Sequence, residues 1–270
     1  MRNISGSGAR WVPVVLTLIT FGCGHGPSDG PPAAAGPTPG YTQVAPLFST
    51  ETLLLDLDGD VVHRWESDST PGQAALLKPD GHLLRAGSVG PMGNGTFTGG
   101  GAGGLVEELD WDGNRVWRFD YSSTRHLSHH DIELLPNGNI LMIAWERKTR
   151  GEATAAGRAP EFVGEQGLWP DSLIEVKPTP PEGGEIVWEW HVWDHLVQDR
   201  DPDRPHYGDI AAHPSRININ PPGWVDALTD DQREQLEALG YLPGEEKASE
   251  PVDRRHQHPD WNHINSVAYN

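Results

Sequence analysis

Histidine is the residue type whose number and spacing in this sequence could do chemistry. The chain holds thirteen histidines, and three of them, His129, His130 and His263, fall at the entry to repeated hairpins. His130 and Gln73 occupy the same place relative to the turns of two successive repeats, and the third repeat has the segment 262–265 there. Such positions converge on one cavity if they lie on inner strands of a rotationally repeated fold. Imidazoles act as acids, bases and nucleophiles near pH 7, so two of them in one slot favour a functional site.

Other interpretations of these histidines stay open. A single histidine at a strand start is more often a hydrogen-bonded structural residue than a catalytic one, and two in the same slot favour function more than one does. His126, His129 and His130 lie close enough in sequence for a metal site. The sequence offers no helical His-x-x-x-His pair with a glutamate and no cysteine ligand there, so we predict no metal. Loop or surface positions are predicted for His126, His191, His195, His206, His213, His256 and His258.

A threefold repeat supplies the elements that would position these residues. Its copies read LLLDLDGDVVHRW from residue 53, LVEELDWDGNRVWRF from residue 105 and LIEVKPTPPEGGEIVWEW from residue 173. Asp58-Gly59 and Asp112-Gly113 are strong signals of tight hairpin turns, because glycine adopts the positive φ that these turns need. Large side chains two residues apart, such as His63 and Trp65, lie on one face of a strand.

A second hairpin follows each of the first two copies, at Lys78-Pro79-Asp80-Gly81 and at Leu135-Pro136-Asn137-Gly138. Two hairpins per unit predict four-stranded antiparallel blades and therefore an all-β propeller, of which this chain holds about two and a half blades. A plain β-sandwich is the alternative. Insertions are expected at about 150–170, as a loop, and at about 191–260, which includes a surface helix over residues 229–240.

Composition narrows the classes of partner. The net charge of −19 argues against nucleic acid, whose phosphates need Lys and Arg, and against a basic membrane-binding patch. The 32 glycines, 24 prolines and eleven tryptophans fit a turn-rich β fold better than a helical one.

The N-terminal region predicts export. Residues 1–23 combine two arginines with a short apolar run, which is typical of a signal peptide and too short to span a bilayer. Cys23, the only cysteine, stands where a signal peptidase would cut, so we predict lipid attachment there, with an ordinary cleaved signal or an unused thiol as alternatives. Residues 24–44 are rich in Gly, Pro and Ala and predict a tether. We therefore expect a periplasmic or outer-surface protein with a lipid anchor.

The ordered motifs LLLDLDGDVVHRW, SHHDIELLPNGNILMI, SLIEVKPTPPEGGEIVWEW and DWNHINSVAYN, spread over residues 45–270, resemble the arylsulfotransferase (arylsulfate sulfotransferase) propellers. The resemblance implies an exported six-bladed propeller that moves a sulfuryl group from a phenolic sulfate ester to a phenol. No nucleotide donor and no other cofactor is implied; the partners are a small-molecule aryl sulfate and a phenol. In the family a histidine is transiently sulfated, while further histidines and an arginine bind the sulfuryl oxygens.

Residue by residue, the resemblance makes His263 a sulfuryl-binding, catalytic residue and gives His130 the same role, with His129 as the competing assignment. His129 and Asn265 are assigned to substrate binding. Imidazolium donors at these positions would stabilise the charge that develops on a leaving phenolate. The family's arginine and nucleophilic histidine have no counterpart before Asn270, so we expect the chain to be a fragment of a longer protein. A non-catalytic exported binding scaffold and metal-dependent chemistry at the histidines are the alternative functions.

Overall fold

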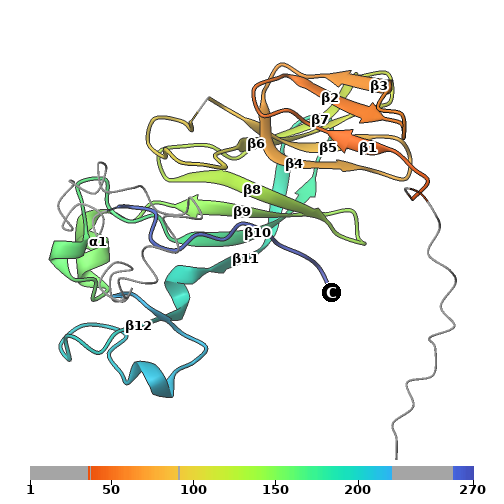
Figure 1. Ribbon diagram of the computed structural model, residues 1–270. Coiled ribbons are helices and arrows are strands. Elements are labelled where there is room, and N and C mark those ends of the chain that lie inside the picture. Colours follow the sequence, from red (N-terminus) through yellow and green to blue (C-terminus); the bar gives the residue numbers. More distant parts are fainter. Residues whose placement is uncertain (1–35, 37, 91, 221–257) are drawn as a thin grey trace, which may run out of the picture. The chain divides into compact units, whose positions relative to one another are not determined.

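The computed structural model describes residues 36, 38–90, 92–220 and 258–270. The chain divides into two units, Met1–Pro39 and Gly40–Asn270, and almost all described residues belong to the second. Cys23 and the helix predicted over 229–240 lie outside the described residues. The described residues are dominated by strands, as predicted (Figure 1).

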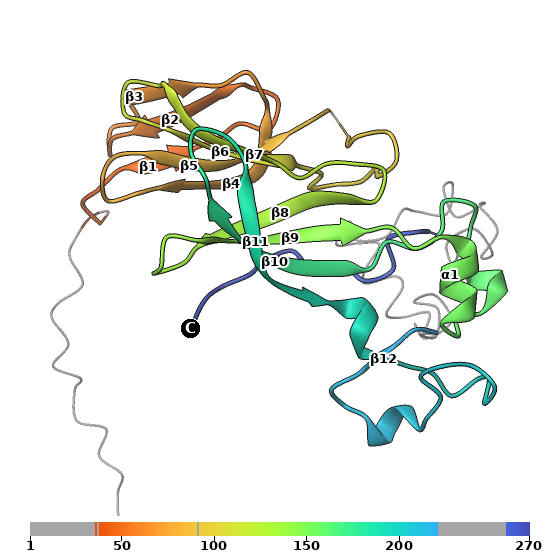
Figure 2. The same cartoon turned by 180° about the vertical axis from the view of Figure 1, so that it is seen from behind.

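Antiparallel strands build three sheets in the described residues, and two short parallel strands form a fourth (Figures 1 and 2). The first sheet contains β1 (Thr42–Val44), β2 (Glu51–Leu55) and β3 (Val61–Glu66). The second contains β4 (Pro71–Leu77), β5 (Leu83–Ser88), β6 (Gly104–Leu109) and β7 (Arg115–Asp120). The third contains β8 (His126–Leu134), β9 (Ile140–Glu146), β10 (Asp171–Pro178) and β11 (Gly184–His191). The parallel pair is β12 (Leu196–Val197) and β13 (Ile217–Asn218).

The predicted hairpins form because their turn residues satisfy the backbone locally. Between β2 and β3, the Asp56 carboxylate accepts hydrogen bonds from the backbone N–H groups of Asp58 and Asp60 at 3.0 and 2.9 Å. Gly59 in that turn has a φ of 87°, a conformation that costs glycine little. The equivalent glycine between β6 and β7, Gly113, has a φ of 85°. The turn signals in the sequence therefore placed these hairpins correctly.

The partition of hairpins into sheets differs from the predicted one. Each four-stranded sheet joins the second hairpin of one repeat to the first hairpin of the next, because β5 pairs with β6 and β9 pairs with β10. The predicted unit had the two hairpins of the same repeat in one blade. The predicted grouping of hairpins into blades was wrong. Turn residues show where a hairpin lies, but they do not show which neighbouring strand pairs with its outer edge.

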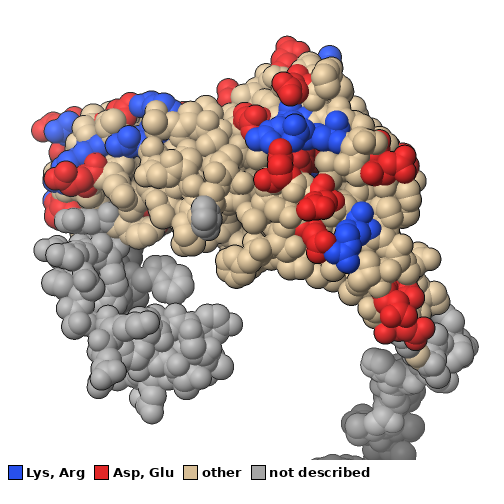
Figure 3. All heavy atoms as spheres, turned by 90° about the horizontal axis from the view of Figure 1, so that it is seen from above, with Lys and Arg blue, Asp and Glu red and all other residues tan. Residues whose placement is uncertain are grey.

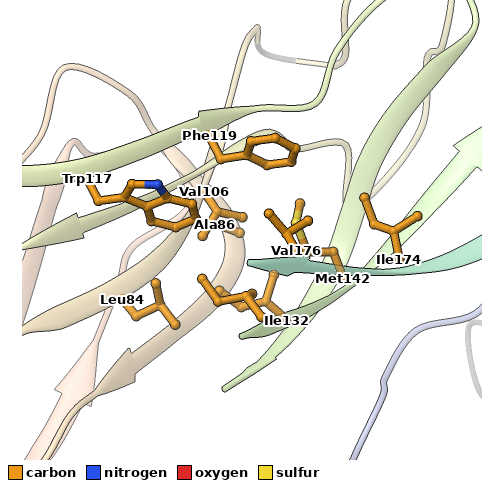
Figure 4. Packing of buried hydrophobic residues seen from close by; sticks show 10 residues of the cluster. Leu84, Ala86, Val106, Trp117, Phe119, Ile132, Met142, Ile174 and Val176 are labelled. Atoms are coloured by element: carbon orange, nitrogen blue, oxygen red, sulfur yellow. The ribbon is translucent and has the colours of Figure 1, made fainter. Parts of the chain in front are cut away.

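Successive sheets are tied together by apolar packing and by indole hydrogen bonds. The faces of the two four-stranded sheets share a buried cluster of ten residues, which includes Trp117 and Phe119 of β7 and Ile174 and Val176 of β10 (Figure 4). Trp117 Nε1 donates a 2.8 Å hydrogen bond to a carbonyl of the β10–β11 turn, and Trp65 Nε1 donates a 3.0 Å bond to the β6–β7 turn. The fold is consistent with stacked, propeller-like blades.

The predicted loop at 150–170 contains helical structure instead. α1 (Arg150–Ala155) begins with a capping box in which Thr149 and Glu152 satisfy each other's backbone N–H groups. A 3-10 turn, Pro160–Phe162, follows it. The helix has six residues and a single fully buried one, Ala153, so the sequence shows no repeating apolar pattern there.

Among the described helices, none has the length and apolar character needed to cross a membrane.

Some charged side chains on the second sheet are locally paired. On the face in Figure 3, basic side chains lie beside acidic ones. Arg118 illustrates this arrangement, because its guanidinium lies 2.9 Å from Asp120 and 3.6 Å from Asp68.

Candidate functional site

A backbone bulge presents His130 to the inside of the fold. The register between β8 and β9 shifts between Ser128 and Ile132, so the residues between them leave the ladder. His130 adopts a φ of 55°, in the left-handed region that non-glycine residues rarely occupy. Gln73 has a φ of 86° at the matching bulge of β4. The two positions that the sequence placed in one rotational slot therefore share an unusual backbone conformation.

Three histidines converge at this bulge. His129 Nδ1 lies 3.0 Å from His130 Nδ1, and His130 Nε2 lies 3.5 Å from His263 Nε2. The ring centroids of His129 and His263 are 5.3 Å apart. The side chain of His129 has no exposed surface, whereas that of His263 is 32% exposed. The cluster therefore has a closed end at His129 and an open end at His263.

Asp171 anchors the closed end of the cluster. This carboxylate is fully buried at the start of β10, and its Oδ1 lies 2.9 Å from His129 Nε2. Its Oδ2 accepts hydrogen bonds from the backbone N–H of Ile264 at 2.6 Å and from Asn262 Nδ2 at 3.2 Å. One side chain therefore holds both His129 and the segment that carries His263.

Two further carboxylates fix the open end. Asp260 Oδ2 lies 2.7 Å from His263 Nδ1 and orients that ring with its Nε2 toward His130. Asp131 Oδ2 accepts a 3.1 Å hydrogen bond from the backbone N–H of Val267. Residues 258–270 are therefore attached to the third sheet through side chains and not through a strand pairing.

Trp145 and Gly101 form the walls of the cluster. The Trp145 ring stacks on His129 with centroids 4.1 Å apart and planes at 14°. The Gly101 carbonyl accepts a 2.8 Å hydrogen bond from the His130 N–H, and a Cβ at Gly101 would overlap the His130 ring. Glycine is required there because the loop backbone and the imidazole are in direct contact.

Burial keeps the inner members of the cluster neutral at pH 7. It lowers the pKa of His129 to about 3 and the pKa of His130 to about 4, with a smaller effect from the neighbouring histidines. Burial also raises the pKa of Asp171 to about 8, although the Ile264 N–H opposes that change. The expectation of imidazolium donors is therefore wrong for His129 and His130. They offer N–H groups or lone pairs without a charge.

The remaining predicted positions do not join this hydrogen-bonded cluster. Asn265 is exposed, and its side chain has no hydrogen bond within the described residues. Gln73 is also exposed and lines a pocket of about 510 Å³ with Phe48, Met92 and the loop that contains Gly101. His126 stacks on Tyr121 at 4.0 Å, and His213 is exposed. Cys23 lies outside the described residues.

The cluster could also hold a small cation. One nitrogen from each of His129, His130 and His263 can be chosen so that all three lie within 4.8 Å of one another. Carboxylates that orient the far nitrogens, as Asp171 and Asp260 do, are common around metal-binding histidines. A second group, Asp80, His82 and Glu108, already has Lys78 as a cationic partner, whose Nζ lies 2.7 Å from Glu108 and 3.3 Å from Asp80.

Sequence reasoning missed Asp171, Asp260 and Trp145. An aspartate that begins an apolar strand, as Asp171 does, was the available signal, since a buried carboxylate needs partners. Trp145 faces Asp171 across the β9–β10 pair, a register that the sequence did not specify.

Comparisons with known proteins identify a family. A family model described as arylsulfotransferase (ASST) matches residues 42–270. No curated protein matches the chain. Among solved structures, a protein of unknown function from Bacteroides caccae is similar, with 12% identity and a TM-score of 0.34. That match covers 57% of this chain and 41% of the other, so this chain spans less than half of that protein's length.

Proposed function

This chain belongs to the arylsulfotransferase family, and from that premise we propose that it contributes the sulfuryl-binding histidines of a protein that transfers a sulfuryl group from a phenolic sulfate ester to a phenol. The reaction uses no nucleotide donor and proceeds through a sulfated histidine. The observation that carries the proposal is the convergence of His129, His130 and His263 from two distant segments, with His130 and His263 nitrogens 3.5 Å apart.

The imidazole nitrogens of the cluster suit this substrate. A sulfate ester is an anion, and its sulfuryl oxygens accept hydrogen bonds from preorganised N–H donors. His130 Nε2 and His263 Nε2 face the same space at the open end of the cluster, where they would bind oxygens of the sulfate ester. Asp171 lies at the closed end with a pKa raised to about 8, so it adds little negative charge near the substrate at pH 7.

The covalent step divides the transfer into two halves. In the first, an imidazole nitrogen attacks sulfur and the phenolate leaves; in the second, the acceptor phenol takes the group. The family resemblance gives His130 and His263 the binding role and assigns the nucleophile to another histidine. Mass spectrometry of protein quenched with donor alone would identify the sulfated histidine.

The test is turnover of p-nitrophenyl sulfate by the full-length protein, with and without added phenol. We expect phenol-dependent release of nitrophenolate, which His263→Ala reduces by about two orders of magnitude, the loss typical when one transition-state hydrogen-bond donor is removed. His213→Ala, which removes an exposed histidine outside the cluster, is the matched control and should be unaffected. No phenol-dependent release, with unchanged behaviour of His263→Ala, would instead favour a binding scaffold.

Chelation separates sulfuryl transfer from metal-dependent chemistry at the same histidines. The proposed mechanism predicts that exhaustive dialysis against a strong chelator leaves turnover unchanged. If turnover is lost and added zinc restores it, the histidines His129, His130 and His263 would instead be ligands of a catalytic metal ion.

We further propose that the chain is exported and anchored by a lipid on Cys23. The support is the sequence of residues 1–23 and the Gly/Pro/Ala-rich stretch that follows. Cys23→Ala should move the protein from the membrane fraction to the soluble fraction of the cell envelope. An unchanged distribution would contradict lipid attachment.

A further inference from the structure

The buried residues behind the substrate-facing histidine form an unbroken hydrogen-bonded chain. Asp171 Oδ1 lies 2.9 Å from His129 Nε2, and His129 Nδ1 lies 3.0 Å from His130 Nδ1. His130 Nε2, the far end of this chain, faces His263 and the open side of the cluster. Both nitrogens of His129 and both nitrogens of His130 therefore take part in this chain of contacts.

Each of these hydrogen bonds holds one proton, and this leaves two arrangements. In the first, Asp171 carries a proton and donates to His129 Nε2, His129 Nδ1–H donates to His130 Nδ1, and His130 presents Nε2–H outward. In the second, all donors and acceptors are reversed, and His130 presents a lone pair at Nε2. Asp171 Oδ2 accepts the Ile264 and Asn262 N–H groups in both, so the carboxyl proton stays on Oδ1.

We propose that Asp171, His129 and His130 form a proton relay for sulfuryl transfer, an inference that rests on the proposed function. His130 Nε2–H gives its proton to the oxygen of the departing phenolate. Later it takes the proton of the acceptor phenol. Asp171 and His129 are positioning residues in this scheme, because they act on the substrate only through His130.

The protons and bonds balance over the two half-reactions. In the first, the bond between sulfur and the phenolic oxygen breaks and a sulfur–nitrogen bond forms at the imidazole of the sulfated histidine, which the family resemblance places outside this cluster. The phenolate oxygen takes the His130 Nε2 proton, His130 Nδ1 takes the His129 Nδ1 proton, and His129 Nε2 takes the Asp171 proton. The second half-reaction reverses each transfer and leaves Asp171 protonated again.

A relay of this kind avoids a charged imidazole. The low pKa values of His129 and His130, about 3 and about 4, show that an imidazolium is unfavourable at either position. The raised pKa of Asp171, about 8, makes this carboxyl the group that loses or gains the proton. Asp260 supports that value by charge repulsion and His263 opposes it, whereas Asp131 acts on His130 in the direction of a higher pKa.

Asp171→Asn should freeze the relay in one arrangement. The Ile264 and Asn262 N–H groups need an acceptor, so the amide oxygen takes the place of Oδ2 and the amide NH₂ faces His129. The amide cannot release a proton, which leaves His130 permanently as the Nε2–H form. Substrate binding, which uses that N–H, is preserved.

The kinetic test varies the leaving group. Phenyl sulfate releases a basic phenolate that needs a proton, whereas p-nitrophenyl sulfate releases a stable anion that does not. We expect Asp171→Asn to lower kcat by about 10²–10⁴-fold for phenyl sulfate, the usual contribution of a general acid, with KM nearly unchanged. The loss for p-nitrophenyl sulfate should be less than about tenfold. Glu107→Gln, which alters another fully buried carboxylate away from the histidines, is the matched control and should not discriminate.

An equal loss for the two esters would overturn the relay while leaving the proposed function intact; no turnover of either ester by the wild type would count against the function itself. If Asp171→Asn fails to fold, His129→Phe keeps the ring stacked on Trp145 and breaks the relay, and the same discrimination is expected.

The second readout is nitrogen NMR of the protein labelled at histidine. The wild type should change from the Nε2–H to the Nδ1–H form of His130 near pH 8, and Asp171→Asn should remain Nε2–H throughout. A wild-type His130 whose proton stays on one nitrogen between pH 6 and 10 would contradict the relay.

Discussion

His130 Nε2 and His263 Nε2 lie 3.5 Å apart although 133 residues separate the two histidines in the sequence. The two facing nitrogens form a hydrogen bond only if one carries a proton and the other does not. The Nδ1 atom of each ring determines whether its Nε2 carries the proton. His130 Nδ1 contacts His129, and His263 Nδ1 contacts Asp260. The protonation of the open end is therefore set by buried groups on two segments.

Substitution of both histidines should show that they act together. We expect His130→Ala and His263→Ala each to lower kcat/KM by about 10²–10³-fold, and the double variant to lose much less than the product of these factors. The reason is that removal of either ring leaves the other without a partner. Steady-state kinetics with p-nitrophenyl sulfate measures the three variants. Losses that multiply would show that the two rings act independently.

Gly101→Ala should damage the site by displacing the His130 ring. A Cβ there would overlap the imidazole, and we expect at least a tenfold loss of kcat/KM with about 1–3 kcal/mol less stability. Gly95→Ala is the control, because its φ of +85° resembles the +75° of Gly101 but nothing lies within 4 Å of the new Cβ. It shares the backbone strain without the collision. Equal losses of activity in both variants would assign the effect to strain alone.

The buried His129 should make stability depend on pH. Its pKa falls from an ordinary value near 6.5 to about 3 in the folded protein, so protonation favours the unfolded chain. The stabilisation that neutral His129 gives is complete above pH 6.5 and is lost as the pH falls toward 3, by about 1.4 kcal/mol per pH unit. Asp171 acts in the opposite direction, because its raised pKa gives stability at low pH that is lost as the pH rises toward 8.

Urea unfolding of the wild type and of His129→Phe at pH 7, 6 and 5 isolates this contribution. The stability difference between the two proteins should shift in favour of the variant below pH 6.5. A difference that stays constant over this range would contradict the lowered pKa.

Trp117→Phe tests the indole hydrogen bond between sheets. The substitution removes a 2.8 Å bond to the Gly183 carbonyl and part of a buried ring, so we expect a loss of about 2–4 kcal/mol in the free energy of unfolding. Trp111→Phe is the control: Trp111 is 46% exposed and should cost less than about 1 kcal/mol. Similar losses in the two variants would show that the inter-sheet bond contributes little.

The local parts of the fold were predictable from the sequence, and the long-range parts were not. Gly59 and Gly113 marked their hairpins because a tight turn has strict backbone requirements. Which hairpins share a sheet depended on edge pairings between β5 and β6 and between β9 and β10, and the same apolar patterns fit either partner. The capped helix α1 was too short to leave a periodic signal.

The site divides in the same way. His130 and His263 could be placed near each other because a repeated register relates their positions, whereas Asp171 has no counterpart in the other repeats that would draw attention to it. The neutral state of His129 and His130 also required the structure, because burial is its main cause. The sequence suggested charged donors because it did not show how deeply these two histidines are buried.

The matching bulges at Gln73 and His130 have a consequence for how such a site can change over evolutionary time. Both backbones already adopt the left-handed conformation, with φ values of 86° and 55°, although one carries an amide and the other an imidazole. A non-glycine residue in this conformation brings a strain of about 1–3 kcal/mol. Because Gln73 and His130 share the conformation, this strain comes from the bulge of the repeat and not from the histidine side chain. Duplication of a hairpin pair would therefore copy the bulge with its left-handed backbone conformation. A single codon change from glutamine to histidine could then place an imidazole at the copied position without a change in the main chain.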